Sequence, residues 1–172
     1  KENGSVAIPA KILLETLKAL PNQLVTFEAD LEQRSLVITT ETGMYKMAVD
    51  PPDDFPALPT SNDAEIMVPV ERLMSGINYT IFATTSDEMR PAMTGVNVVV
   101  DFNKISFVAS DGHKLVRYHA LGTSTEQTGS FVIPKKAMSL LKGATPSEGN
   151  VYLKYNKSHA FFRFEETEVI CR

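Results

Sequence analysis

The stretch Ile66-Met-Val-Pro69-Val-Glu-Arg-Leu-Met74 decides the fold, because its pattern occurs three times in the chain. In each copy, apolar residues stand three positions and one position before a proline, and more apolar residues follow it at helical spacing. The other copies are Val6-Ala-Ile-Pro9-Ala-Lys-Ile-Leu-Leu14 and Phe131-Val-Ile-Pro134-Lys-Lys-Ala-Met138. The prolines are 60 and then 65 residues apart, which suits a half-domain repeat better than a short solenoid unit.

Each copy predicts a short strand followed by a one-sided helix. Proline lacks an N–H and has a fixed φ, so it ends a strand and fits the first turn of a helix. The residues after each proline then place apolar side chains on one helical face. These stripes are Ala10, Leu13, Leu14 and Leu17; Val70, Leu73, Met74, Ile77 and Ile81; and Ala137, Met138, Leu141 and Ala144.

Three short segments of alternating polarity follow each helix, separated by turn residues such as Asp101-Phe-Asn-Lys104 and Asp111-Gly112. We therefore expect an α+β fold built from β-α-β-β-β half-domains. The expected strands are 24–31, 35–40 and 44–49 in the first copy, 93–101, 104–110 and 113–121 in the second, and 151–155, 160–164 and a last strand near Glu168 in the third.

Residues 50–62 contain four prolines and are expected to form an extended connector between two domains. With the boundary near Thr60, residues 1–60 are the second half of one domain with its connector. Residues 61–172 are two halves of the next domain, with the last strands missing or cut short. Because the chain begins at Lys1 and runs almost at once into a strand-like pattern, we expect it to be a fragment of a longer polypeptide.

Composition narrows the class of protein. A chain of 172 residues with 43% apolar content can bury a real core, and no apolar run approaches the roughly 18 to 20 residues of a membrane span. A net charge of −4 argues against a surface that grips nucleic acid everywhere but permits one basic face. The single cysteine, Cys171, favours a reducing compartment such as the cytoplasm.

The stretch Ser110-Asp-Gly-His-Lys-Leu115 invites an enzymatic interpretation, a hydrolase or metal enzyme that uses His113. Residues that flank a turn glycine diverge, however, so Asp111 and His113 have no natural route to the Asp–His contact of a triad. A metal would need more ligands than His119 and His159 supply at their spacing. We therefore predict no catalytic residue, no metal and no cofactor.

Three other interpretations of the chain stay open at this point. The stretch could be a simple hairpin turn with one polar side chain. It could also be the rim of a peptide-docking hollow with an apolar floor of Met93 and Leu115, whose strands we expect to be adjacent in the sheet. A secreted β-rich binding module would instead carry glycan at Asn78 or Asn156.

Basic residues recur on the three predicted helices. Lys11 and Lys136 both stand two residues after the repeated proline. Each basic residue alone is compatible with an ordinary solvated helix face, but their recurrence predicts one basic surface if the helices line it together. The remaining members of this set are Lys18, Arg72, Lys135 and Lys142.

Together the three repeats, the connector Asp53-Asp-Phe-Pro-Ala-Leu-Pro59, the segment Arg90-Pro-Ala-Met-Thr-Gly95 and above all Ser110–Leu115 resemble the bacterial DNA polymerase III beta subunit family, the sliding clamps. The resemblance runs in order along nearly the whole chain, from the end of the first clamp domain through most of the middle one. It implies a head-to-tail ring of two subunits with helices lining a central hole and antiparallel sheets outside. Such a ring encircles duplex DNA and tethers the replicative polymerase, without chemistry of its own.

The resemblance also implies a partner pocket, which receives a Gln-Leu-x-Leu-Phe type of motif from the polymerase alpha subunit, the clamp loader, other polymerases and repair proteins. Pro91 and Ala92 replace an aromatic DNA contact of the family, so no DNA role is expected there. The rest of the pocket and one ring interface would belong to sequence beyond Arg172. The matching pocket positions here are Met93, Ser110, Gly112, His113, Lys114 and Leu115.

Overall fold

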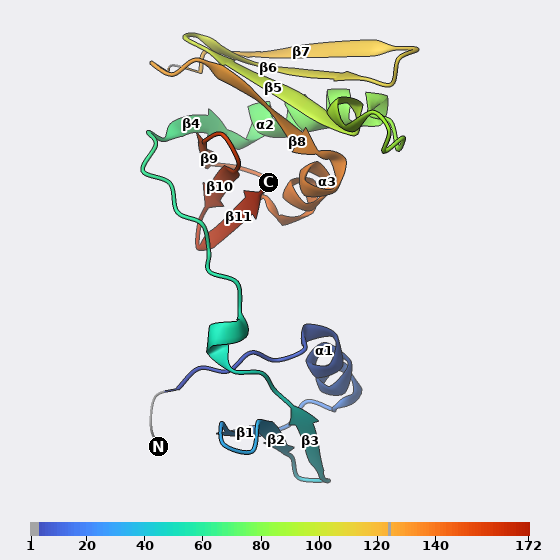
Figure 1. The fold of residues 1–172 in the computed structure, drawn as a ribbon, viewed down its shortest axis with the longest axis vertical. Coiled ribbons are helices and arrows are strands. Elements are labelled where there is room, and N and C mark those ends of the chain that lie inside the picture. Colours follow the sequence, from blue (N-terminus) through green and yellow to red (C-terminus); the bar gives the residue numbers. More distant parts are fainter. Residues whose placement is uncertain (1–3, 124) are drawn as a thin grey trace. The chain divides into compact units, whose positions relative to one another are not determined.

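The computed structural model describes residues 4–123 and 125–172. The chain divides into two compact units, Lys1–Leu58 and Pro59–Arg172 (Figure 1). In the part of the chain that the structure describes, no helix has the length and apolar character needed to cross a membrane.

The first unit is one helix and a three-stranded antiparallel meander around a small core. Leu36 and Ile38 of the central strand and Val49 are buried, with Leu13 of the helix packed against them. No residue of the helix is fully buried, and Ile12 and Leu14 are each 53% exposed. The elements are α1 (Ala10–Ala19), β1 (Thr26–Asp30), β2 (Ser35–Thr39) and β3 (Met44–Ala48), in the sheet order β1-β2-β3.

Two expectations for this unit need correction. The strand predicted before Pro9 is reduced to an isolated bridge, in which Ala7 and Asp50 exchange two backbone hydrogen bonds. The connector is not extended throughout, because Pro52–Asp54 form a 3-10 turn, η1. Pro52 starts this turn because the fixed φ of proline already suits a helical first position.

The second unit contains the β-α-β-β-β motif twice, which confirms the α+β prediction. Its two antiparallel four-stranded sheets have the orders β7-β6-β5-β8 and β11-β10-β9-β4. The elements are β4 (Ile66–Pro69), α2 (Val70–Thr80), η2 (Ile81–Ala83), η3 (Pro91–Met93), β5 (Gly95–Asp101), β6 (Lys104–Ser110), β7 (Leu115–Leu121), β8 (Gly129–Pro134), α3 (Lys135–Ala144), β9 (Asn150–Tyr155), β10 (Ala160–Phe164) and β11 (Thr167–Cys171).

The two halves of this unit exchange their leading strands. β4, which opens the first half, pairs with β9 of the second, while β8, which opens the second half, pairs with β5 of the first. The helix starts are exchanged in the same way. The first N–H of α2, on Val70, donates to the carbonyl of Gly149 at 3.0 Å, and that of α3, on Lys135, donates to Thr94 at 3.2 Å. Each proline is thus the last extended residue before its helix, and the opposite half supplies the acceptor that a side-chain cap would otherwise provide.

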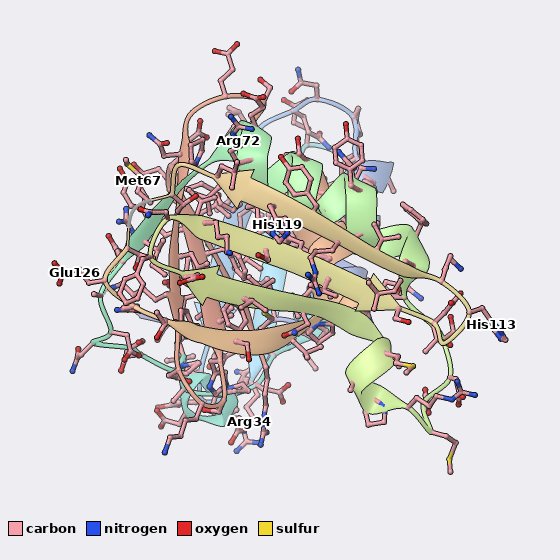
Figure 2. The ribbon with its side chains drawn as sticks, turned by 90° about the horizontal axis from the view of Figure 1, so that it is seen from above. Arg34, Met67, Arg72, His113, His119 and Glu126 are labelled. Carbon is pink, nitrogen blue, oxygen red and sulfur yellow. The ribbon has the colours of Figure 1, made fainter. Side chains whose placement is uncertain are left out.

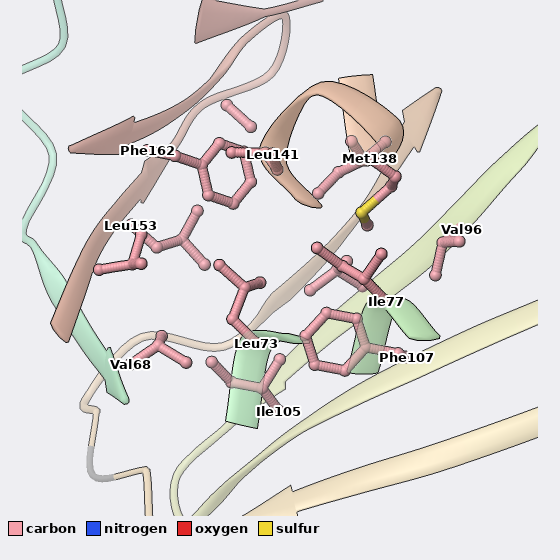
Figure 3. Close-up of a cluster of buried hydrophobic side chains, with 14 of the residues drawn as sticks. Val68, Leu73, Ile77, Val96, Ile105, Phe107, Met138, Leu141, Leu153 and Phe162 are labelled. Atoms are coloured by element: carbon pink, nitrogen blue, oxygen red, sulfur yellow. The ribbon is translucent and has the colours of Figure 1, made fainter. Parts of the chain in front are cut away.

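The core of the second unit lies where both helices meet the inner faces of both sheets (Figure 3). The predicted stripe of α2 supplies Leu73 and Ile77, and that of α3 supplies Met138 and Leu141, all of them buried. Alternation along β5 buries Val96, Val98 and Val100, as expected for a sheet with one face in the core. This packing fixes both sheets, and with them the turn between β6 and β7.

Candidate docking turn and basic helix faces

The turn Ser110–Leu115 joins the ends of β6 and β7 and is closed by its own side chains. Gly112 has φ of +90°, a conformation that favours glycine. The Oδ1 atom of Asp111 accepts hydrogen bonds from the backbone N–H groups of His113 at 3.0 Å and Lys114 at 2.9 Å. This is the Asx-turn geometry in which a short carboxylate replaces a backbone acceptor.

Ser110 closes the other side of the turn. Its Oγ donates to the carbonyl of Lys114 at 2.9 Å and accepts from the N–H of Gly112 at 3.1 Å. The Lys114 carbonyl also accepts from the N–H of Asp111 at 3.3 Å. Every backbone N–H from Asp111 to Lys114 therefore has a partner inside the turn.

The charged side chains of the turn pair with each other. The Lys114 ammonium folds back onto Oδ2 of Asp111 instead of extending into solvent. This hydrogen bond, with the two backbone N–H groups on Oδ1, holds the pKa of Asp111 well below its ordinary value. The Asp111 carboxylate is thus ionised throughout the neutral range, and it binds the backbone N–H of His113 rather than the imidazole ring.

The expectation that Met93 and Leu115 lie on adjacent strands is wrong. β6 lies between β5 and β7, and Met93 belongs to η3 and not to a strand. Pro91 starts this 3-10 turn, so β5 begins only at Gly95, two residues later than predicted.

Instead, the segment that contains η3 approaches the turn Ser110–Leu115 through the side chain of Arg90, the residue just before η3. A Cβ built on Gly112 would lie 3.0 Å from Nη1 of Arg90, and Nε of Arg90 pairs with Oδ2 of Asp87 at 3.1 Å. Sequence reasoning missed Arg90, although an acidic residue three positions before it and its place in the quoted segment 90–95 were available signals.

An apolar side chain stands open beside the closed turn. Leu115 is 64% exposed at the start of the edge strand β7, and Met93 is half-buried. Figure 2 shows His113 at the turn end of the sheet, projecting away from it. The turn thus offers an exposed apolar side chain and an imidazole on a backbone whose N–H groups are hydrogen-bonded within the turn.

The other histidines do not join His113. His119 lies over the middle of the sheet in Figure 2, where its Nδ1 is 2.8 Å from Oγ of Ser106 on the neighbouring strand. His159 packs beside Phe161 on β10. Within residues 4–123 and 125–172, no three His, Cys, Asp or Glu side chains gather where they could hold a metal ion.

The six predicted basic residues are all exposed and all on helices. Lys11 and Lys18 lie on α1 of the first unit, and the other four lie on α2 and α3 of the second. The ion pairs found among the described residues involve none of the six. In the second unit, Lys135 and Lys136 line an open hollow together with Thr85, Ser86, Glu88, Thr94, Pro134 and Ser139.

The second unit, with its paired β-α-β-β-β halves, has the DNA-clamp class of fold. The DNA polymerase III subunit beta of Pseudomonas aeruginosa superposes with a TM-score of 0.83 over 95% of this chain and 46% of its own, at 21% identity. The DNA polymerase sliding clamp of Bacillus subtilis does so with a TM-score of 0.87 over 97% of this chain and 44% of its own, at 25% identity.

Family models identify the chain more closely. Residues 67–172 match the central domain of the DNA polymerase III beta subunit, and residues 1–59 match its N-terminal domain. The chain belongs to the DNA polymerase III beta subunit family.

Curated relatives of the chain include proteins named beta sliding clamp. The protein of Staphylococcus epidermidis is 32% identical over 99% of this chain and 46% of its own length, and that of Synechocystis is 28% identical over 100% and 49%. The chain thus spans about half the length of the curated relatives it matches.

Proposed function

We propose that the protein acts as a DNA polymerase processivity factor, a non-catalytic sliding clamp that encircles duplex DNA in the cytoplasm as a homodimeric ring. Membership of the beta subunit family supports the class. The observation that carries the proposal is the turn Ser110–Leu115, whose backbone N–H groups from Asp111 to Lys114 are all bonded within the turn while Leu115 stays 64% exposed beside it. Such a surface suits partners that dock and leave: the replicative polymerase alpha subunit, the clamp loader, other polymerases and repair proteins.

The docking site consists of the six predicted positions, Met93, Ser110, Gly112, His113, Lys114 and Leu115, and it receives a Gln-Leu-x-Leu-Phe type of motif. Burial of each apolar side chain of that motif contributes about 1.5–3 kcal/mol. Two such side chains must offset several kcal/mol of lost translational and side-chain freedom. The affinity is therefore about micromolar at best, which suits partners that exchange on one ring.

The DNA-facing surface consists of the exposed helix residues Lys11, Lys18, Arg72, Lys135, Lys136 and Lys142. Their ammonium and guanidinium groups are not committed to the ion pairs of the described residues, so they are available to phosphates. If about three phosphates are neutralised at a time, the slope of log K against log salt is only about −3. Such weak, sequence-independent contacts permit sliding, while the closed ring prevents escape.

Fluorescence anisotropy of a labelled Gln-Leu-Ser-Leu-Phe peptide with the complete protein tests the docking site. Leu115→Lys places a charge where the apolar motif residue must be buried, and we expect binding to weaken at least tenfold. Leu121→Lys is the matched control, because Leu121 is also 64% exposed and ends the same strand. Equal affinity of both variants, or no binding by the unaltered protein at hundreds of micromolar, would refute the docking site.

A further inference from the structure

Most of the hydrogen bonds within the turn Ser110–Leu115, the docking turn, involve a single residue. Asp111 binds the N–H groups of His113 and Lys114 through Oδ1 and the Lys114 ammonium through Oδ2. Its own N–H also donates to the Lys114 carbonyl. We infer that Asp111 is the positioning residue of the docking turn, holding residues 112–114 in the conformation that presents His113 and Leu115 to a partner peptide. This inference rests on the proposed docking function.

The turn needs such a residue because its central residue is glycine. Gly112 at φ of +90° can populate many other conformations at little cost. Ser110 accepts the N–H of Gly112 and donates to the Lys114 carbonyl, but it accepts no other N–H of the turn. Without the Asp111 side chain, the N–H groups of His113 and Lys114 therefore lose their acceptor. If the docking conformation then falls to about a tenth of the population, the apparent dissociation constant rises about tenfold.

Geometry, and not charge, is the property of Asp111 that matters here. The Asx turn requires an acceptor oxygen on the γ-carbon of the side chain, which Asn also has and which Glu carries one carbon too far away. The ion pair with Lys114 lies at the surface, where the Lys114 side chain is 49% exposed, so it contributes little. Asparagine should therefore preserve the turn and glutamate should not.

The same bonds define the chemistry of the partner. Because the N–H groups of Gly112, His113 and Lys114 are all bonded within the turn, they cannot form a nest for a carboxylate. The turn does not capture a peptide by its charged C-terminus. Instead, an apolar side chain of the peptide packs against Leu115. An internal or amidated motif therefore binds as well as one with a free carboxylate.

The test measures the affinity of the labelled Gln-Leu-Ser-Leu-Phe peptide, with free and amidated C-termini, for variants of the complete protein. We expect Asp111→Ala and Asp111→Glu to raise the dissociation constant about tenfold and Asp111→Asn to stay within about twofold of the unaltered protein. The two peptide forms should bind equally well.

Asp101→Ala is the matched control. The Oδ1 of Asp101 accepts the N–H of Phe102, and its carboxylate pairs with Lys104 at 3.6 Å, in the turn at the opposite end of β6. This variant should bind the peptide normally.

Two patterns overturn the inference while leaving the docking site in place. One is normal binding by Asp111→Ala, and the other is normal binding by Asp111→Glu combined with weak binding by Asp111→Asn, which would assign the effect to charge. Unchanged binding by Leu115→Lys is a different result, because it removes the docking site itself. Urea unfolding of the Asn and Glu variants shows whether their stabilities match, so that an affinity difference between them reports on the turn.

Discussion

Gly76 of α2 lies against the ring of Phe107 of β6 so closely that a Cβ on Gly76 would be 2.5 Å from two ring carbons. Both residues are buried in the core of the second unit. A glycine inside a helix costs about 0.5–1 kcal/mol relative to alanine. Close packing between the helix and the sheet explains why a residue with this cost stands here.

Gly76→Ala should destabilise the protein even though alanine favours the helix. The added methyl group must displace Phe107, and overpacking of this kind costs about 1–3 kcal/mol. After the gain in helix propensity, we expect a net loss of about 1–2 kcal/mol in urea unfolding. Gly143→Ala in α3 is the control, because nothing lies within 4 Å of its added Cβ, and it should be neutral or stabilising. A Gly76→Ala protein as stable as the original would show that the helix can move off the sheet freely.

The sequence pattern predicted the helices well, because the proline before each helix and the apolar stripe along it both depend on residues close together in the sequence. The proline that ends each strand and the stripe Leu73 and Ile77 depend on backbone sterics and a 3.6-residue period. The exchange of β4 and β8 between halves was not predictable in this way. The same alternation fits pairing within a half or between halves, and only the tertiary arrangement selects one.

In the candidate site, too, the local features were predictable and the tertiary ones were not. Asp111-Gly112 predicted the turn, since these residue types favour turn conformations wherever they occur. The close approach of Arg90 to Gly112 joins two segments far apart in the sequence, and only the tertiary arrangement brings them together. The predicted proximity of Met93 and Leu115 assumed that their strands are neighbours, and the meander β5-β6-β7 does not make them so.

Glu65 gives the second unit a pH-dependent contribution to stability. Its two carboxylate oxygens each accept from Nη2 of Arg163 at 3.0 Å, and Lys154 lies at 3.4 Å. The Arg163 hydrogen bond is the main cause that lowers the pKa of Glu65. Because the pKa is lower in the folded protein than in the unfolded chain, the contribution is complete above the ordinary Glu pKa of about 4.3 and is lost as the pH falls through the folded value.

We therefore expect Glu65→Gln to reduce the free energy of unfolding at pH 7 by a few tenths to about 1 kcal/mol, as exposed ion pairs do. The difference from the original protein should shrink as the pH is lowered below about 4. Urea unfolding at several pH values measures this. Glu148→Gln, at an exposed position outside the ion pairs of the described residues, should show no such trend. A Glu65→Gln difference that stays constant with pH would mean that the carboxylate charge is not responsible.

Charge reversal on α3 tests the DNA-facing surface. Lys135→Glu combined with Lys136→Glu should weaken retention of the complete ring on duplex DNA, and the defect should grow as salt is lowered, because repulsion replaces phosphate contacts. The control reverses Lys104, the first residue of β6, and Lys157, in the turn between β9 and β10, neither of which lies on a helix. If both pairs have the same effect, net charge accounts for the result and the helix residues have no special role.

Gly112→Ala separates the strain of the turn from its role in docking. Alanine at φ of +90° costs about 1 kcal/mol or more of stability, and its Cβ meets Arg90 at 3.0 Å, so the turn must shift as well. Gly122→Ala carries a similar backbone cost, with φ of +79°, but its Cβ meets nothing within 4 Å. Urea unfolding should therefore show comparable losses for the two variants, whereas peptide anisotropy should show weaker binding only for Gly112→Ala. Adding Arg90→Ala to Gly112→Ala removes the clash but not the strained φ, so recovered binding would assign the defect to the displaced turn. Unchanged binding by Gly112→Ala itself would mean that the peptide does not depend on the conformation of this turn.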